Sequence, residues 1–127
     1  FYYYTDRNDL DNSDFLNPGQ IILINCSDSI LSNINISYSS TGLMLIYCTN
    51  MSVLDSNFSN NFDGIILQFS DDNSIFRNLF DNNYHSGITL TESNNSLIYW
   101  NIVSNNNADL TPNTYPGGGP PSTSTIP

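Results

Sequence analysis

Residues 64–83 read GIILQFSDDNSIFRNLFDNN, and residues 87–106 repeat the same pattern as GITLTESNNSLIYWNIVSNN. In both stretches a glycine precedes a short apolar run, which then gives way to Ser, Asn and Asp. Four such glycines, Gly19, Gly42, Gly64 and Gly87, recur at nearly constant intervals. A fixed period in the range of about 20–50 residues predicts a solenoid in which each repeat forms one coil.

The apolar residues of the units fall into columns. The columns are Ile21, Leu43, Ile65 and Ile88; Leu23, Leu45, Leu67 and Leu90; Leu31, Val53, Ile75 and Ile98; and Ile36, Phe58, Phe80 and Val103. Leu10 and Phe15 precede Leu31 and Ile36 by almost the same interval, which indicates a partial further unit at the N-terminal end. The runs are short, rich in Ile and aromatic residues and bounded by Asn, Ser, Asp and Gly, which favours strands over helices. We therefore predict an all-β parallel solenoid of about five coils with a 21–23 residue period, whose columns stack about 4.8 Å apart.

The repeat unit has the form G-I-x-L-x-x-S-x-x-N-x-I-x-x-N-x-F-x-x-N. It resembles the right-handed parallel β-helix repeats of the NosD-like and pectate-lyase-like superfamily, over residues 1–107. The resemblance implies a right-handed parallel β-helix similar to exported surface proteins of archaea and bacteria. Because that superfamily includes polysaccharide lyases, hydrolases, epimerases and a periplasmic protein of copper-site maturation, the resemblance does not fix the function.

The composition and net charge limit the classes of partner that the protein can bind. The 127 residues include 12 acidic side chains against Arg7 and Arg77 alone, with a net charge of −10. Such a chain repels phosphate backbones, so nucleic acid is excluded as a partner. No apolar stretch reaches the ~18 residues that span a bilayer, and we expect no signal peptide within these residues. Abundant Asn, Ser and Thr favour an extracellular or cell-surface location, and the absence of an initial Met suggests a processed or excised segment.

The periodicity stops after Asn107, where the sequence becomes ADLTPNTYPGGGPPSTSTIP. Proline has no N–H for a strand ladder, and glycine adds nothing to a core. We therefore predict a β-helix over residues 1–107 and a linker or tail rich in Pro, Gly, Ser and Thr over residues 108–127.

Cys26 and Cys48 share one column, one coil apart, and two interpretations remain open. Neighbouring parallel strands bring Cα atoms to within a distance that a disulfide accepts. Alternatively, small inward side chains fill a corner, in the stack Thr5, Cys26, Cys48, Ser70 and Ser93. A metal site is disfavoured, because the single histidine, His85, lies in the turn before Gly87.

No catalytic residues are predicted, and we expect the protein not to be an enzyme. A polygalacturonase-like site needs three grouped aspartates and basic residues, whereas the chain offers only Asp71, Asp72 and His85. Arg77 aligns with Asp55 of the preceding coil, which predicts a surface ion pair rather than a lyase base.

Calcium is the one ion that the sequence leaves open. Asp6, Asp9, Asp11 and Asp14 form an acidic run, but the run lacks the central Gly and terminal Glu of an EF-hand loop. We expect loose calcium binding there at most, and no other cofactor.

Five sequons occur, at Asn25, Asn35, Asn50, Asn57 and Asn94. The content of Asn, Ser and Thr alone accounts for the number of sequons, so the position of each sequon in the fold is the better guide to glycosylation. Asn35 and Asn57 share a column and Asn50 and Asn94 lie at expected turns, whereas Asn25 lies at the end of a strand and is the poorest candidate. Glycosylation is a hypothesis that depends on export.

With the Leu23 column inward, strand alternation sends a row of apolar side chains outward. The predicted strip comprises Phe1, Tyr3, Ile22, Ile24, Met44, Ile46 and Ile66, with Phe1 beside Ile22 and Tyr3 beside Ile24. Strands that are apolar on both faces are normally covered, so we expect the tail, another part of the polypeptide or another subunit to cover this strip. Neither coil end has a capping helix, which favours head-to-tail stacking into a filament.

The first choice of function is an extracellular structural module of a surface layer, sheath, filament or adhesin that self-associates through its coil ends and the strip. The alternative is a carbohydrate-binding or polysaccharide-degrading β-helix that contacts glycans through side chains able to stack on or hydrogen-bond to sugars. Those candidates are Tyr47, Asp71, Asp72, Tyr99 and Trp100. Because Tyr99 and Trp100 are adjacent, one of them is expected to point inward. Copper delivery rests on the resemblance alone and lacks a His/Met cluster.

Overall fold

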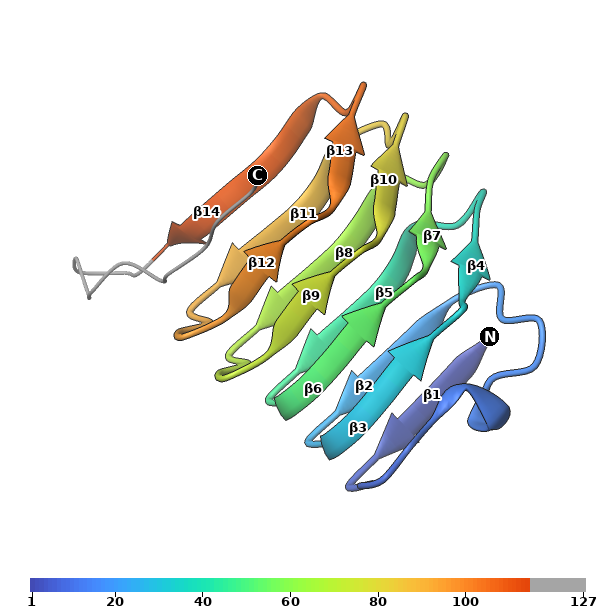
Figure 1. The fold of residues 1–127 in the computed structure, drawn as a ribbon, viewed down its shortest axis with the longest axis vertical. Coiled ribbons are helices and arrows are strands. Elements are labelled where there is room, and N and C mark those ends of the chain that lie inside the picture. Colours follow the sequence, from blue (N-terminus) through green and yellow to red (C-terminus); the bar gives the residue numbers. More distant parts are fainter. Residues whose placement is uncertain (115–127) are drawn as a thin grey trace.

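The computed structural model describes residues 1–114, and the side chains of residues 1–110. The chain winds into a parallel β-solenoid of about five turns, as predicted (Figure 1). Each full coil contributes one strand to each of three sheets, and its apolar side chains point into the interior.

The largest sheet, which we call the six-stranded sheet, consists of β1 (Tyr2–Thr5), β2 (Ile21–Ile24), β5 (Thr41–Ile46), β8 (Asp63–Gln68), β11 (Ser86–Thr91) and β14 (Ala108–Thr114). The β3 sheet consists of β3 (Ser27–Ser32), β6 (Thr49–Leu54), β9 (Ser74–Phe76) and β12 (Leu97–Tyr99). The β4 sheet consists of β4 (Asn35–Ile36), β7 (Asn57–Phe58), β10 (Leu79–Asp81) and β13 (Ile102–Ser104). In residues 1–114 the helical element is one short 3₁₀ turn, η1 (Asn12–Asp14).

The predicted columns are confirmed as ladders. Successive members pair in register along the six-stranded sheet, the β3 sheet and the β4 sheet. The members of the Ile21 and Leu23 columns have no exposed surface. Burying each such side chain stabilises the fold by about 1.5–3 kcal/mol.

The repeated glycine is required by a close approach of two coils. A Cβ on Gly42 would lie 2.7 Å from the carbonyl oxygen of Gly64, and a Cβ on Gly64 would collide with the carbonyl oxygen of Gly87. The same Cβ on Gly64 would lie 2.9 Å from Cδ1 of Phe80. Gly19, by contrast, has open space around its Cβ position. The glycines of the full coils therefore permit the coils to stack at strand spacing.

The coils turn at residues with positive φ, and these residues also form columns. One column, Asn33, Asp55, Arg77 and Trp100, lies between the β3 sheet and the β4 sheet, with φ of 55°, 50°, 55° and 55°. Asn and Asp adopt this left-handed conformation more readily than other side chains do. The corners therefore account for many of the Asn and Asp residues in the sequence.

The first coil is shorter than predicted. Tyr3 pairs with Ile22 and Thr5 pairs with Ile24, so the paired residues are closer in sequence than those of the full coils. The predicted neighbours of Phe1 and Tyr3 are therefore wrong by two residues. Thr5 is exposed on the outer face and does not belong to the stack that contains the cysteines.

Leu10 and Phe15 are buried in the core as predicted, but Leu10 has a different neighbour. Its N–H donates to Ser29 Oγ at 3.0 Å, so it does not lie beside Leu31. In this coil η1 and the loop after it take the place of a strand in the β4 sheet. A period taken from the full coils therefore does not apply here.

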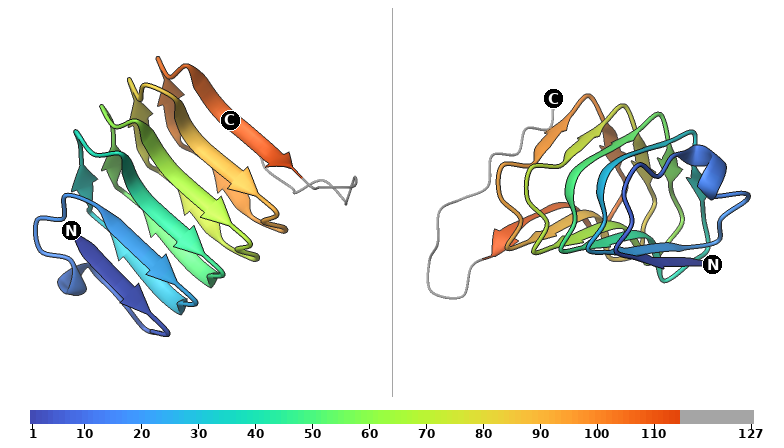
Figure 2. Two further views of the ribbon diagram at one scale, coloured as in Figure 1. Left: turned by 180° about the vertical axis from the view of Figure 1, so that it is seen from behind. Right: turned by 90° about the horizontal axis from the view of Figure 1, so that it is seen from below.

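The N-terminal end of the interior contains aromatic rings. Tyr2 and Tyr4 pack against Phe15, with ring centroids 5.4 and 5.7 Å away. The Tyr2 hydroxyl also donates to the Leu16 carbonyl oxygen at 2.9 Å. Figure 2 shows η1 beside this end.

The sheet continues past the boundary predicted after Asn107. β14 pairs in parallel with β11, with Leu110 opposite Ile88, so residues 108–114 are not part of a tail. The register shifts between Thr111 and Thr114, a segment that contains Pro112. An irregularity of this kind is where a strand accommodates a proline. The rest of the predicted tail, residues 115–127, lies outside the described residues.

Within residues 1–114, no helix has the length and apolar character needed to cross a bilayer.

Candidate functional site

The outer face of the six-stranded sheet carries the predicted apolar strip, which we define as Tyr3, Ile22, Ile24, Met44, Ile46 and Ile66. Tyr3 is 53% exposed, and the other five side chains are half-buried by their neighbours in the sheet. Phe1, the remaining predicted member, lies just before β1 and is 72% exposed. Towards β11 the same two ladders continue as Gln68, Thr89 and Thr91.

The strip carries no charged side chain, and no described element covers it (Figure 2). The predicted cover is therefore not supplied by residues 1–114. An uncovered apolar sheet face of this kind is typical of an interaction surface.

The aromatic residues proposed as sugar contacts stack along the solenoid axis. Tyr99 stacks on Phe76 with ring centroids 5.0 Å apart and planes 5° apart, and Tyr47 stacks on Phe69 at 5.0 Å and 13°. Stacking of this kind occupies ring faces that a sugar would otherwise contact. Trp100 meets Tyr99 edge-on and stays 66% exposed.

The prediction that Tyr99 or Trp100 points inward is wrong. Ile98 and Asn101 are the inward residues, while Tyr99 is half-buried and Trp100 is exposed. Trp100 has a φ of 55°, so the chain turns a corner there and strict alternation ends.

Asp71 and Asp72 lie away from Tyr99 and Trp100. The two aspartates precede β9. Tyr99 is the last residue of β12 and Trp100 follows it, so these two residues lie at the other end of the β3 sheet. Asp71 Oδ1 accepts a hydrogen bond from the Asn94 N–H at 2.6 Å. The structure therefore does not bring the five predicted sugar contacts together.

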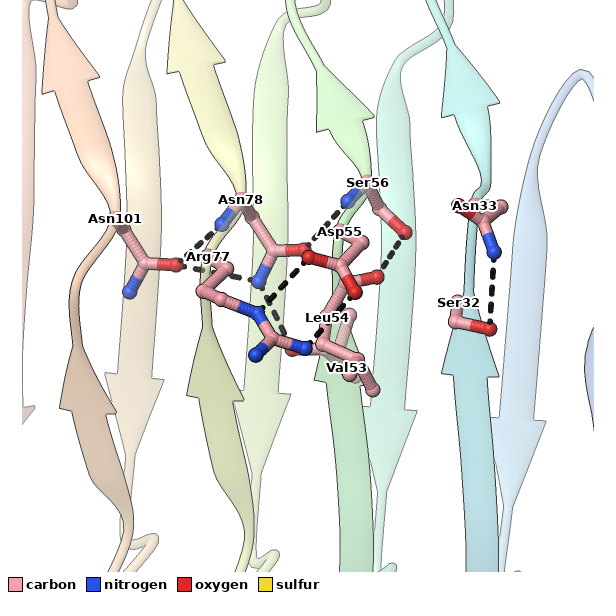
Figure 3. Close-up of polar contacts among 9 residues, drawn as sticks. All are labelled: Ser32, Asn33, Val53, Leu54, Asp55, Ser56, Arg77, Asn78 and Asn101. Carbon is pink, nitrogen blue, oxygen red and sulfur yellow. Dashed lines mark hydrogen bonds and ion pairs between the residues drawn. The ribbon is translucent and has the colours of Figure 1, made fainter.

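The predicted ion pair between Arg77 and Asp55 is confirmed (Figure 3). Arg77 Nε and one terminal nitrogen each lie 2.9 Å from an Asp55 carboxylate oxygen. The guanidinium also lies 5.2 Å from the centroid of the Phe76 ring. Both side chains are nearly half exposed, so the pair is a surface contact of small energetic value.

The acidic run at the N-terminal end organises a turn. Asp11 Oδ1 accepts hydrogen bonds from the N–H and hydroxyl of Ser13, and these bonds hold the pKa of Asp11 below its usual value. Asp14 accepts from the Asp11 N–H at 2.8 Å, and Asp6 accepts from the Asn25 amide at 2.6 Å. Within residues 1–114, no three His, Cys, Asp or Glu side chains gather as a metal site.

Cys26 and Cys48 are both buried and both are free thiols in the structure. The Cys48 thiol donates to the Leu23 carbonyl oxygen at 3.3 Å, and burial raises its pKa to about 11. A neutral buried thiol behaves as a small apolar side chain. Ser70 and Ser93 continue the stack in the following coils, and the Cys48 N–H donates to Ser70 Oγ at 3.0 Å.

The sequon asparagines lie at the surface to different extents. Asn25, Asn35 and Asn50 are exposed, while Asn57 and Asn94 are half-buried. Asn35 and Asn57 pair directly, as their shared column predicted. Asn25 lies at an exposed corner with a φ of 53°, so its location at a strand end does not hide it. Glycosylation stays a prediction.

One cluster was missed by sequence reasoning. His85 Nδ1 lies 2.7 Å from Asp63 Oδ1, and the Asp63 side chain is only 10% exposed. The two residues are one coil apart, so the period itself would have placed them side by side. His85 was treated as isolated because no other histidine accompanies it.

The family model described as periplasmic copper-binding protein (NosD) matches residues 1–114. The chain belongs to the NosD family. The description places NosD proteins in the periplasm, so the family is an exported one. Comparisons with curated proteins and with solved structures found no match.

The described residues do not fit the copper site that the NosD name implies. The Cys48 thiol is buried and its pKa is raised to about 11, whereas a thiolate is the form that binds metals. Met51 is buried in the core, Met44 lies on the outer sheet face, and His85 bonds Asp63. Within residues 1–114, no three His, Cys, Asp or Glu side chains lie close enough together to hold a metal ion.

Proposed function

We propose that the chain is a non-enzymatic structural module of an exported, cell-surface protein, and that it associates with a second copy through the apolar strip. The observation that supports this proposal is the uncharged outer face of the six-stranded sheet, which no described element covers. Removing such a face from water stabilises an assembly by about 25 cal/mol for each Å² of apolar area.

The placement of the strip favours a two-fold pair. Its aliphatic part is centred on β5, at Met44 and Ile46, with Ile22 and Ile24 of β2 on one side and Ile66 of β8 on the other. A two-fold axis that lies between the two copies and runs parallel to β5 would place β2 of each copy over β8 of the other. Both copies then contribute the same set of residues to the interface, as in the commonest type of homodimer interface. Face-to-face sheets pack about 10 Å apart through such side chains.

Salt should strengthen this association. Each copy has a net charge of −10, so two copies repel each other at a distance. Salt screens that repulsion, with a Debye length of about 10 Å at 0.1 M, and leaves the apolar contact itself intact. The outer edges of β1 and β14 carry no part of this proposal, because further coils of a longer polypeptide would occupy the same edges.

Sedimentation velocity over a range of protein and salt concentrations tests the proposal. We expect the unaltered chain to associate reversibly, more strongly at high salt, and Met44→Asp to sediment as a monomer. Ile30→Asp is the matched control, since Ile30 is 57% exposed on the β3 sheet, and it should behave like the unaltered chain.

Circular dichroism must first show that all three proteins are folded. An unaltered chain that stays monomeric at every concentration, or a Met44→Asp protein that associates equally well, would overturn the proposal. Negative-stain electron microscopy of the same samples distinguishes a closed dimer from sheets or filaments.

Carbohydrate binding is the second candidate function. The predicted residues do not support it as a group, but a different corner of the solenoid does.

A further inference from the structure

The corner between the β4 sheet and the six-stranded sheet carries three aromatic rings from two successive coils. Phe62 immediately precedes β8, and Tyr84 and His85 precede β11. The Phe62 and His85 rings stack with centroids 5.3 Å apart and planes 14° apart, and Tyr84 lies 5.4 Å from Phe62 at 30°. Tyr84 is 79% exposed and Phe62 is 47% exposed. We call Phe62, Tyr84 and His85 the three-ring corner.

A largely buried carboxylate adjoins these rings. Asp63 is 7% exposed, and its Oδ1 lies 2.7 Å from His85 Nδ1. Its second oxygen, Oδ2, has no hydrogen-bond partner among residues 1–114, and it is not sealed from solvent. The corner therefore presents one fixed acceptor that is still free.

Phe62 remains partly exposed. Among the described residues, the rings that pack against it, His85 and Tyr84, both come from the following coil, and Phe62 is 47% exposed. In the preceding coil the backbone partners of Phe62 and Asp63 are Ser39 and Ser40, which have no rings to stack. Ser40 Oγ instead accepts a hydrogen bond from Gln20 Nε2 at 3.2 Å. An apolar ring face thus lies next to hydroxyl and amide groups.

We propose that the three-ring corner, together with Asp63, binds a neutral glycan. Ring faces pack against the C–H faces of a sugar, and a few fixed polar atoms orient its hydroxyl groups. Asp63 Oδ2 accepts from a sugar hydroxyl in a charge-assisted hydrogen bond. The Asp63 carboxylate and the net charge of −10 oppose acidic ligands, so the glycan is uncharged.

Two other groups of rings lack this combination. Tyr47 and Phe69 pair with each other at a corner. The Arg77 guanidinium lies over the Phe76 ring, and its partner Asp55 already uses both carboxylate oxygens for it. The three-ring corner combines partly exposed rings with a fixed carboxylate oxygen that no described residue uses.

The test is an NMR titration of the isotope-labelled full chain with four probes, namely cellohexaose, maltohexaose, chitohexaose and, as the acidic comparison, trigalacturonate. We expect at least one neutral hexaose to shift the backbone amide signals of Phe62, Asp63, Tyr84 and His85, and trigalacturonate to shift none of them. Tyr84→Ala and Asp63→Asn should each weaken the binding about tenfold, as expected for loss of one good contact.

The matched control is Tyr47→Ala, which removes an exposed ring at another corner and should leave the affinity unchanged. Tyr84 is mostly exposed, so its replacement leaves the fold intact even if Asp63→Asn does not. No shifts with any neutral probe, shifts confined to other surfaces, or equal binding by Tyr84→Ala would overturn the proposal. Repeating the titration with Met44→Asp, in which association through the apolar strip is removed, makes the result independent of that association.

Discussion

Cys48 shows how a single position in a ladder responds to its surroundings. Its side chain has no exposed surface, and burial raises the pKa of the thiol from 9.0 to about 11. The unfolded chain therefore releases this proton at a lower pH than the folded chain does. The contribution of the thiol to stability is complete below pH 9 and is lost as the pH rises towards 11.

We predict that the pH dependence of stability changes when Cys48 is replaced by Ser, the residue found at this position in the next two coils. Between pH 9 and 11 the free energy of unfolding of the unaltered chain should fall by on the order of 2 kcal/mol more than that of Cys48→Ser. Urea denaturation at a series of pH values measures both. Parallel pH profiles for the two proteins would contradict the prediction.

Single positions were predictable from the sequence where they face the core and less predictable at corners. The Leu23 column was placed correctly because period and alternation agree there. Trp100 was misplaced because a positive φ interrupts alternation, and a tryptophan gives no sign of that conformation. The cluster of Asp63 and His85 was missed although both lie at equivalent positions of adjacent coils.

At the scale of the coil, buried asparagines hold neighbouring turns together. Asn83 is 2% exposed, and its Oδ1 accepts from the Asn61 N–H at 2.9 Å. Its Nδ2 donates to the Phe58 carbonyl oxygen at 3.0 Å and to Asn106 Oδ1 at 2.9 Å. Asn78 and Asn101 form a similar ladder at the corner shown in Figure 3. One side chain thus satisfies backbone groups that the turn leaves without strand partners.

We predict that Asn83→Ala lowers the free energy of unfolding by about 2–4 kcal/mol, because a buried N–H and a buried carbonyl lose their partner. Asn35→Ala is the control, since Asn35 is exposed and has no side-chain hydrogen bond in the described residues; it should change stability by less than about 0.5 kcal/mol. Urea denaturation of the three proteins measures both effects. Equal stabilities would show that water replaces the asparagine without cost.

The elements of the full coils followed from the sequence, whereas the two end coils did not. In the first coil η1 replaces a strand, which shortens the stretch of chain between paired residues of β1 and β2. In the last coil Asp109 stands where the three preceding coils have glycine, so the marker of the repeat is missing. Leu110, which stands one full period after Ile88, was the remaining sign that β14 follows.

At the scale of the molecule, each coil contacts only its neighbours, so stability is a sum of interfaces between adjacent coils. We predict that the chain of residues 1–107 is less stable than the chain of residues 1–114 by about 3 kcal/mol or more. Removal of β14 exposes the edge of β11 and the buried side chains of Ile88 and Leu90.

Thermal denaturation of the two shortened chains measures this difference. Identical midpoints would mean that β14 adds nothing to the solenoid. A lower midpoint for residues 1–107, with retained β-sheet content, would assign the loss to the last interface alone.

The whole-molecule fold was predictable because one period governs most of the chain. The surfaces that we propose to be functional were less accessible, since the strip draws on four strands, the three-ring corner draws on two coils, and neither contains a sequence motif. The strip followed from alternation, once the inward columns were set. The corner was missed because Phe62, Tyr84 and His85 lie in turns where no alternation applies, although the period places Phe62 beside Tyr84 and Asp63 beside His85.

The backbone hydrogen bonds between coils run along the axis of the solenoid (Figure 1). Tension applied to the two ends would therefore break the backbone hydrogen bonds between coils one coil at a time. Each released coil frees one full period of chain, as between Ile21 and Leu43, and so lengthens the molecule by about 70 Å. A module built in this way yields under pulling in equal steps of low force, so in the assembly that we propose it would act as an extensible link rather than a rigid one.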